Sequence, residues 1–304
     1  VMEKLVSIVI PTYGRSKTIQ RALDSVKGQT YTNIEVIVVN DNAPTTENAE
    51  IVKETIKNYG DIKNGIRLIN NPQNVGGAEA RNIGLHNSNG TYVAFLDDDD
   101  EILPNKIEQQ VKFLEENPNV SLVYCYSKTV FDDSNNNDVV YDKNNYCGNC
   151  LREFLLDGTI AATTQWLCRK DSLNSIGGFD NVPSKQDSTL ILKLLEAGMN
   201  IDVVPEVLSI YHVQSSNSIS TSEKSKLGLA LFRDRCRKHY NILTEKEVRN
   251  VEYKFAEQLY LKNYNDKKKK AENFREMKKN RWFYAYYRAL YYHLFFLKHG
   301  RKNG

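Results

Sequence analysis

The first hundred residues alternate short apolar runs with segments of helical character. The apolar runs are rich in β-branched residues and predict strands over residues 5–10, 34–39, 66–69 and 92–96. The segments between them predict helices over residues 16–29, 46–58 and 77–86. Because both faces of the predicted strands are apolar, the pattern predicts a parallel sheet covered by helices.

After residue 100 the pattern is mixed. It predicts strands over residues 121–126, 163–168, 201–204 and 208–212, and helices over residues 105–116 and 187–197. The Asp/Asn-rich segment 131–145 and the Ser-rich segment 215–225 are expected to be loops, the second at a domain boundary. Later segments are helical in character, over residues 226–240, 244–264 and 266–298, the last with a break. We therefore expect an α/β domain over residues 1–215 and a helical region over residues 216–304.

Polar residues directly follow three of the predicted parallel strands. They are Pro11-Thr12-Tyr13, Asn40-Asp41-Asn42 and the run Asp97 to Asp100. Ligands of parallel sheets bind beyond the carboxyl ends of the strands. We therefore expect these three segments to line one cleft.

Four consecutive acids, Asp97 to Asp100, are the most informative feature of the chain. Like charges this close repel by roughly 1 kcal/mol per pair in water, so a cation is expected beside them. Oxygen ligands favour a hard ion such as Mg²⁺ or Mn²⁺, often shared with substrate phosphates. Alternatively, Pro104 opens a helix and the acids complement its dipole. The run by itself leaves both interpretations open.

Composition narrows the class of protein only slightly. At 304 residues and 40% hydrophobic content, the chain suits one large globular domain with an appendage, and a net charge of +3 does not indicate nucleic-acid binding. Five cysteines fit a reducing cytosol; Cys147 and Cys150 have redox or half-zinc spacing, but ordinary thiols are the alternative. We expect no signal peptide and no membrane-spanning segment, because no apolar stretch is long enough.

Six short motifs follow one another along the chain: VSIVIPTY (6–13), VVND (38–41), GAEARN (77–82), FLDDDD (95–100), IGGFD (176–180) and QD (186–187). In this order they make the chain resemble the family 2 glycosyltransferases. These enzymes have the GT-A fold, a Rossmann-like, mostly parallel sheet flanked by helices. Each motif is weak alone, whereas six in order across residues 5–215 are specific. The helical region lies outside the resemblance.

The resemblance implies a nucleotide-binding site at the rim of the sheet. Pro11, Tyr13 and Asp41 would line the base pocket, with Asp41 accepting a hydrogen bond from uracil N3. Tyr13 as an ordinary rim aromatic and Asp41 as a turn residue are the alternatives. Asp98 would hold the ribose, and Asp97 would contribute to ribose or metal binding.

The resemblance also implies cations beside the donor diphosphate. Asp99 would bind a Mn²⁺ or Mg²⁺ ion that bridges the diphosphate, and Arg81 would lie near the phosphates unless it is a surface arginine. His212 stands two positions before the place where many relatives carry a metal- or phosphate-contacting histidine, and Gln214 occupies that place. Metal ligation and a hydrogen-bonded structural role both stay open for His212.

Asp187 is the catalytic residue that the resemblance implies. It would be the general base that takes the proton from the acceptor hydroxyl in a single, inverting displacement, a contribution of about 10²–10⁴-fold. Asp187 also precedes Ser188 where an N-cap belongs, and the two roles can coexist. Many relatives have Glu-Asp here, so Gln186 removes one carboxylate and puts in doubt any acceptor contact made by that Glu.

The C-terminal segment combines aromatic and basic residues. If residues 281–298 are helical, apolar and aromatic side chains occupy nearly the whole circumference, unlike those of a free solvated helix. The segment is too short to span a bilayer, and Trp, Tyr, Lys and Arg favour the membrane interface. Peripheral membrane contact, homo-oligomerisation and packing on the chain's own domain all stay open.

The expected function is transfer of a hexosyl or N-acetylhexosaminyl group from a nucleotide diphosphate donor, above all a UDP-sugar, to a hydroxyl of a glycan or lipid-linked acceptor. The reaction would be inverting and metal-dependent. It would serve polysaccharide biosynthesis in the cytoplasm, at the inner face of the cell membrane. The alternatives are a sugar-phosphate nucleotidyltransferase, although its Gly-rich basic loop after the first strand is missing, and a non-catalytic scaffold subunit.

Overall fold

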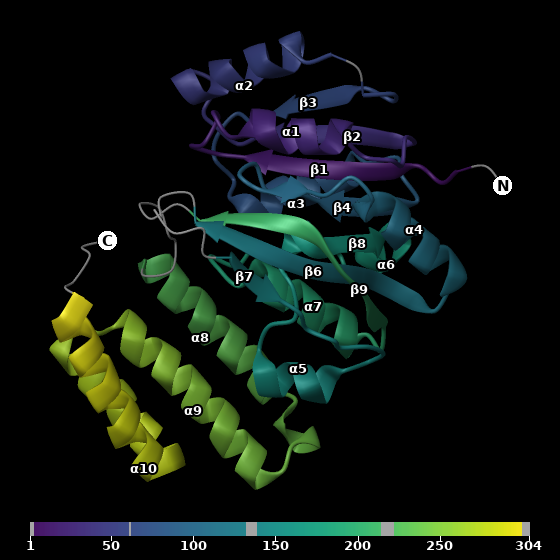
Figure 1. Ribbon diagram of the computed structural model, residues 1–304. Coiled ribbons are helices and arrows are strands. Elements are labelled where there is room, and N and C mark those ends of the chain that lie inside the picture. Colours follow the sequence, from purple (N-terminus) through teal and green to yellow (C-terminus); the bar gives the residue numbers. More distant parts are fainter. Residues whose placement is uncertain (1–2, 61, 132–138, 214–221, 300–304) are drawn as a thin grey trace. The chain divides into compact units, whose positions relative to one another are not determined.

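The chain divides into two compact units (Figure 1). The computed structural model describes residues 3–60, 62–131, 139–213 and 222–299. The α/β unit comprises residues 1–151, 160–181 and 186–214, and the helical unit comprises residues 152–159, 182–185 and 215–304. Two short segments, 152–159 and 182–185, therefore join the helical unit, although the predicted boundary at residue 215 assigns them to the first domain.

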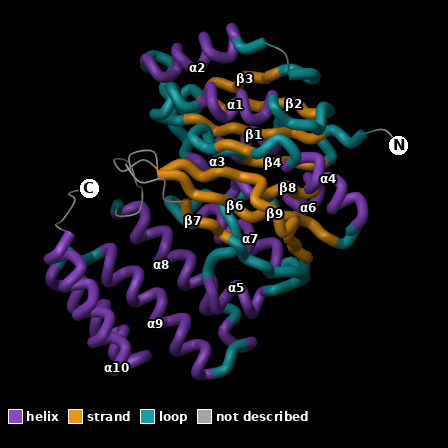
Figure 2. Tube along the Cα trace, viewed as in Figure 1, coloured by secondary structure: helices purple, strands orange, loops and turns teal. Residues whose placement is uncertain are grey.

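In the α/β unit, nine strands of the described residues form one sheet, in the order β3-β2-β1-β4-β8-β6-β9-β5, with β7 beside β6 (Figure 2). The strands are β1 (Val6–Thr12), β2 (Ile34–Asn40), β3 (Ile66–Asn70), β4 (Tyr92–Phe95), β5 (Glu101–Ile102), β6 (Val120–Phe131), β7 (Val139–Asp142), β8 (Trp166–Arg169) and β9 (Asn200–Val213). Strands β3, β2, β1 and β4 pair in parallel, as predicted. Strand β8 is antiparallel to both β4 and β6, so the second half of the sheet is mixed.

Helices cover both faces of the parallel strands. The helices of this unit are α1 (Ile19–Lys27), α2 (Glu47–Asn58), α3 (Gly77–His86), α4 (Lys106–Glu116), α6 (Lys170–Ser175) and α7 (Gln186–Glu196). Residues of α1 and α4 share one hydrophobic core with Ile8 and Ile10 of β1. Helix α3 packs on the other face, where a Cβ at Gly84 would lie 2.2 Å from a methyl carbon of Val9. Glycine at position 84 thus lets α3 approach the sheet closely.

Three predictions for the second half of this unit need correction. The two strands expected over 201–204 and 208–212 are one strand, β9, because a bulge opposite Cys125 and Tyr126 absorbs Pro205 and Glu206. The strand expected from Thr163 begins only at Trp166, after a single 3₁₀ turn. The expected loop 131–145 contains β7, which pairs with β6, while residues 132–138 lie outside the described residues.

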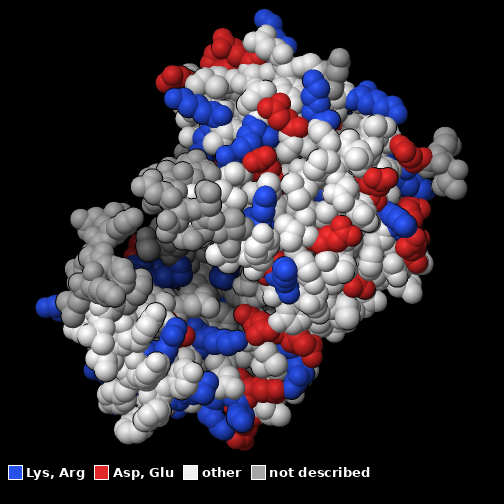
Figure 3. All heavy atoms as spheres, in the orientation of Figure 1, with Lys and Arg blue, Asp and Glu red and all other residues white. Residues whose placement is uncertain are grey.

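The helical unit contains α5 (Leu151–Asp157), α8 (Glu223–Arg237), α9 (Glu245–Lys262) and α10 (Lys267–His299). Thr244 and Glu247 form a capping box that starts α9. Helix α10 is two helical segments that meet at Arg281, whose φ of −151° is not helical. Figure 3 shows basic and acidic side chains close together over α5 and α9, and a largely uncharged surface over α10.

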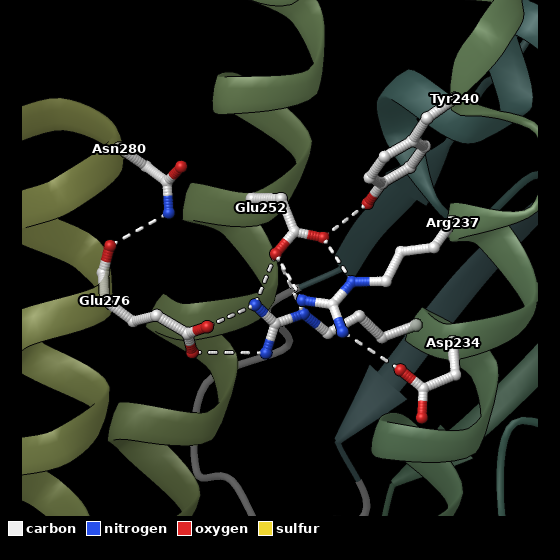
Figure 4. Close-up of polar contacts among 7 residues, drawn as sticks. Asp234, Arg237, Tyr240, Glu252, Glu276 and Asn280 are labelled. Carbon is white, nitrogen blue, oxygen red and sulfur yellow. Dashed lines mark hydrogen bonds and ion pairs between the residues drawn. The ribbon is translucent and has the colours of Figure 1, made fainter.

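An ion-pair network centred on Glu252 joins three helices of this unit (Figure 4). The carboxylate of Glu252 accepts hydrogen bonds from Arg237 Nη2 at 2.8 Å and from Tyr240 Oη at 2.8 Å. Arg233 donates to Glu252 and, at 2.8 Å, to Glu276 of α10. Burial alone would raise the pKa of Glu252, but the hydrogen bonds from Arg237, Arg233 and Tyr240 lower it to about 2.

Two further sequence predictions can be compared with the described residues. None of their helices is both long enough and apolar enough to cross a membrane. All five cysteines are free thiols, with Cys147 exposed and Cys150 buried.

Candidate active site

The carboxyl ends of β1 and β2 bring the first two polar segments together. Thr12 pairs with Asn40, and the Asp41 backbone N–H donates to the Thr12 carbonyl at 2.9 Å. Tyr13 follows with its side chain 59% exposed, while Pro11 is half-buried at the end of β1. An exposed aromatic ring at this rim is free to stack on a planar ligand.

Asp41 has a definite structural role. Its side chain is buried and accepts hydrogen bonds from the side-chain amide of Asn71 and from the backbone N–H groups of Val75 and Gly76, each at 2.9 Å. These bonds fix the loop that leads from β3 into α3. The structure therefore favours neither a free carboxylate nor a simple turn residue, and recognition of a base by Asp41 stays a prediction.

Arg15 lies against the acidic run that follows β4. Its Nη2 atom is 3.0 Å from Asp98 Oδ1, and its Nη1 atom contacts Asp99. Asp98 is 1% exposed and Asp99 is 9% exposed, so both carboxylates are held out of bulk water. The cation expected beside the acids is thus supplied in part by a residue of the chain that the sequence analysis did not single out.

Burial governs the ionisation of the acidic run. Burial raises the pKa of Asp98 to about 7, although Arg15 and the Thr12 hydroxyl act in the opposite direction. Burial and the charge of Asp97 likewise raise the pKa of Asp100 well above its ordinary value, and burial raises the pKa of Asp99 despite Arg15. The run therefore has less positive charge around it than full ionisation requires.

Arg81, in the motif GAEARN, contacts residues of three other sequence motifs. From α3 it donates to Asp97 Oδ1 at 2.5 Å and to Gln186 Oε1 at 3.0 Å, and its guanidinium carbon lies 5.8 Å from the Phe179 ring centroid. The neighbouring Asn82 exchanges two hydrogen bonds with the Phe179 backbone, at 2.8 and 2.9 Å. With its side chain 12% exposed, Arg81 is not a surface arginine, and its place near the phosphates stays a prediction.

Asp187 lies in the first turn of α7, directly after Gln186. Its side chain is half-buried, and Oδ1 accepts a hydrogen bond from the Ser188 backbone N–H at 2.7 Å. The contact of Gln186 with Arg81 thus brings the start of α7 to the Arg81–Asp97 pair. The catalytic role of Asp187 stays a prediction.

His212 and Asp100 close the acidic run on the side of β9. The His212 backbone N–H donates to Asp100 Oδ1 at 3.2 Å, and the Thr164 hydroxyl donates to Asp100 Oδ2 at 2.7 Å. The His212 ring places Nε2 at 2.7 Å from Glu101 Oε1. This contact gives His212 a hydrogen-bonded structural role, while metal ligation by His212 stays a prediction.

The residues present fit a divalent cation only in part. The oxygen chemistry of Asp97 and Asp99 suits Mg²⁺ or Mn²⁺. Within the described part of the chain, however, no three His, Cys, Asp or Glu side chains converge to hold a metal ion, and Arg15 contacts Asp99. A cation at Asp99 would therefore need most of its ligands from a bound substrate or from water.

Four of the sequence-predicted residues and two others make up a connected rim. Arg81, Asp97, Asp98 and Asp99 come together with Arg15 and Gln186, whereas Pro11, Tyr13 and Asp41 form a neighbouring patch at the ends of β1 and β2. Arg15 was missed, although its place two residues after Tyr13 puts it beyond the same strand end. Thr164 carries no signal in the sequence, because it reaches Asp100 from a distant 3₁₀ turn.

The fold of this chain is the GT-A fold of glycosyltransferases. The crystal structure of S. aureus TarS 1–349 in complex with UDP-GlcNAc is similar, with a TM-score of 0.62 at 18% identity, covering 91% of each chain. The mannosyltransferase PcManGT from Pyrobaculum calidifontis, in complex with GDP-Man and Mn²⁺, has a TM-score of 0.55 at 19% identity, covering 93% of this chain and 70% of that one. At these identities the likeness establishes the fold.

The sequence gives the family. The family model of glycosyl transferase family 2 matches residues 7–177, and the chain belongs to this family. An uncharacterized glycosyltransferase of Haemophilus influenzae is 27% identical over 257 residues, covering 82% of this chain and 81% of that protein. The Escherichia coli UDP-Glc:alpha-D-GlcNAc-diphosphoundecaprenol beta-1,3-glucosyltransferase WfgD is 34% identical over 136 residues, covering 45% of this chain and 49% of WfgD.

Proposed function

We propose that the protein transfers a hexosyl or N-acetylhexosaminyl residue from a UDP-sugar to a hydroxyl of a glycan or lipid-linked acceptor, with inversion at the anomeric carbon. Membership of the family supports sugar transfer. The name of WfgD supports a UDP-hexose donor and a lipid-diphosphate-linked acceptor, and the UDP-GlcNAc complex of TarS supports a UDP-sugar donor. The GDP-Man complex of PcManGT is the reason to include donors with other bases in the screen described below.

The observation that carries the proposal is the position of Arg81. It contacts Asp97, at the start of the acidic run, and Gln186, next to Asp187. One guanidinium thus joins the expected donor side of the site to the expected acceptor side. A nucleotidyltransferase or a scaffold would not require this connection between β4 and α7.

The proposed chemical step is a single displacement. A carboxylate oxygen of Asp187 takes the proton of the acceptor hydroxyl, and the hydroxyl oxygen of the acceptor forms a bond to the anomeric carbon. The bond from the anomeric carbon to the diphosphate oxygen breaks, and its electron pair leaves with the diphosphate. Arg81 would lie near the leaving phosphates, where a positive charge stabilises the negative charge that develops.

The nucleotide would bind across the ends of β1, β2 and β4. We propose that Tyr13 stacks on the base next to Pro11 and that Asp41 accepts a hydrogen bond from it. Asp98, with Asp97 beside it, would bind the ribose hydroxyls. The raised pKa of Asp98 favours this role, because a protonated carboxyl donates a hydrogen bond as well as accepting one.

A Mn²⁺ or Mg²⁺ ion would bind through Asp99 and phosphate oxygens, with His212 as a further candidate ligand. Bound there, it would neutralise charge on the diphosphate. Arg15 would then keep its contact with Asp98 and release Asp99. The protein would work in the cytoplasm at the inner face of the membrane, with contact to membrane or to a second copy through residues 281–298.

A screen of nucleotide release tests the proposal. The full chain with Mn²⁺ is incubated with common UDP-, GDP-, dTDP- and CMP-sugars, and slow donor hydrolysis reports turnover without a known acceptor. We expect one UDP-sugar to be hydrolysed above the rest, and EDTA or Asp99→Ala to abolish the signal. Activity undiminished in EDTA would refute the requirement for a metal ion. No turnover and no nucleotide binding with any donor would favour a scaffold.

A further inference from the structure

Helix α10 presents two apolar stripes on opposite sides. Ala285 and Tyr292 are buried, with Ala289 beside them, in a cluster with Tyr253, Ala256 and Tyr260 of α9. The opposite stripe follows the spacing i, i+4, i+7, i+11 along one helix face. Its members and their exposed fractions are Phe283 77%, Tyr287 61%, Leu290 59% and Leu294 56%. The packing of α10 on α9 therefore buries one apolar stripe and leaves a second, continuous apolar stripe exposed to solvent.

Basic and aromatic groups border this outward stripe. Trp282 is 63% exposed and Tyr286 is 47% exposed. Lys278 lies over the Tyr286 ring at 5.0 Å, and the guanidinium of Arg281 lies over the Tyr284 ring at 4.5 Å. Trp, Tyr, Lys and Arg around an apolar face are the composition of a helix that lies in the headgroup region of a membrane.

The charge of residues 267–294 favours an anionic surface over a second copy of the chain as the partner that covers the outward stripe. Residues 267–294 contain nine Lys and Arg and two Glu, a net charge of +7, whereas the whole chain carries only +3. Pairing this segment with its own copy would bring two such charges together, which repel each other. An anionic bilayer attracts the same charge while it covers the apolar stripe.

We propose that the outward stripe of α10, Phe283, Tyr287, Leu290 and Leu294, docks the protein in the plane of an anionic lipid surface. This docking rests on the membrane-face location given under the proposed function, and it names the surface of the protein that would make the contact. It requires neither a donor nor an acceptor, so it is tested separately from the transfer reaction.

Vesicle flotation of the full chain tests the docking. Vesicles of phosphatidylcholine are compared with vesicles that contain about one third phosphatidylglycerol. We expect co-flotation with the anionic vesicles, weakened by high salt and much lower with the neutral ones. A Phe283→Ser/Leu290→Ser variant should bind at least about tenfold more weakly, because two exposed apolar anchors are removed.

The matched control lies on α8. Leu227 and Leu231, 55% and 45% exposed, are apolar residues of the same unit outside the stripe. A Leu227→Ser/Leu231→Ser variant should float like the wild type. All four substituted residues are exposed, so circular dichroism should show unchanged folding in both variants. UDP release measured in parallel reports separately on the transferase.

Tryptophan fluorescence gives a second readout. The chain has two tryptophans, and Trp166 is fully buried, so a blue shift on adding anionic vesicles reports Trp282 entering the interface. Absence of flotation and of the blue shift in the wild type overturns the proposal, as does unchanged flotation of the Phe283→Ser/Leu290→Ser variant. A concentration-dependent dimer that this variant abolishes, without vesicle binding, overturns it in favour of a second copy.

Discussion

Two charged clusters of the molecule contrast in how well their carboxylates are compensated. At the rim of the sheet, burial raises the pKa of Asp98 to about 7 and also raises those of Asp99 and Asp100, even though Arg15 contacts two of the acids. In the helical unit, Arg237, Arg233 and Tyr240 lower the pKa of Glu252 to about 2. The acidic run therefore has too little positive charge nearby for all of its carboxylates to ionise readily, whereas the carboxylate of Glu252 is compensated by two arginines.

The difference indicates different roles. A fully paired network such as that of Glu252 holds helices together, and breaking it leaves buried charge. A cluster of acids with too little positive charge weakens the fold, and such arrangements concentrate at functional sites. We therefore expect changes at the rim to alter catalysis and ligand binding more than stability, and changes at Glu252 to do the reverse.

The largest expected effect is on catalysis. Asp187→Asn should lower the transfer rate by about 10²–10⁴-fold, because the amide cannot take the acceptor proton. The thermal midpoint should stay close to that of the wild type. Turnover of the preferred donor with its acceptor, measured with Asp171→Asn as a surface control, checks this. Full transfer activity in Asp187→Asn would remove the mechanism and leave the fold unaffected.

The second largest expected effect is a loss of stability when the ion-pair network around Glu252 is broken. Glu252→Gln leaves Arg233 and Arg237 without their shared carboxylate and should lower the free energy of unfolding by about 3 kcal/mol. Urea unfolding measures this change. The control is Glu245→Gln on the same helix, whose side chain is 93% exposed and which should cost almost nothing. UDP release per folded molecule should be unchanged in both variants, and a selective loss in Glu252→Gln would contradict the separation of roles.

The same carboxylate predicts a pH dependence. The pKa of Glu252 is about 2 in the folded protein and 4.5 in its ordinary state, so its stabilising contribution is present above pH 4.5 and is lost as the pH falls toward 2. The stability difference between wild type and Glu252→Gln should therefore shrink by about 2 kcal/mol over this range, allowing for partial solvent screening. Urea unfolding at a series of pH values checks it, and a constant difference would argue against the depressed pKa.

The smallest effect concerns Asp98 and has the opposite sign. Because the pKa of Asp98 rises from 3.8 to about 7 on folding, the folded state binds this proton more tightly, and stability falls as the pH rises from about 4 to 7. Asn imitates the protonated acid, so Asp98→Asn should gain on the order of 1 kcal/mol relative to wild type between pH 5 and pH 8. Thermal unfolding at both pH values, with the exposed Asp171→Asn as control, measures the gain. If Asp98→Asn were less stable than the wild type at pH 8, Arg15 would compensate the charge of Asp98 fully.

The sequence predicts the strand ends well and the polar partners poorly. Continuous apolar runs identify β1, β2 and β4, and the residues that follow them must share one edge of the sheet, so Asp41 and Asp97 to Asp100 could be placed in advance. The role of Asp41 in fixing the loop before α3 could not be predicted from the sequence. Its partners at Val75 and Gly76 are backbone N–H groups, which no side-chain pattern reveals. The bulge at Pro205 and the contact of Thr164 with Asp100 likewise depend on long-range packing.

Calorimetric titration of UDP, with and without Mn²⁺, tests whether the rim of the sheet is the nucleotide site. We expect Mn²⁺-dependent binding to the wild type that is lost in Asp99→Ala and retained in Glu252→Gln, because the proposed binding site is the rim and not the helical network. Equal binding by wild type and Asp99→Ala, or loss of binding in a folded Glu252→Gln, would contradict it.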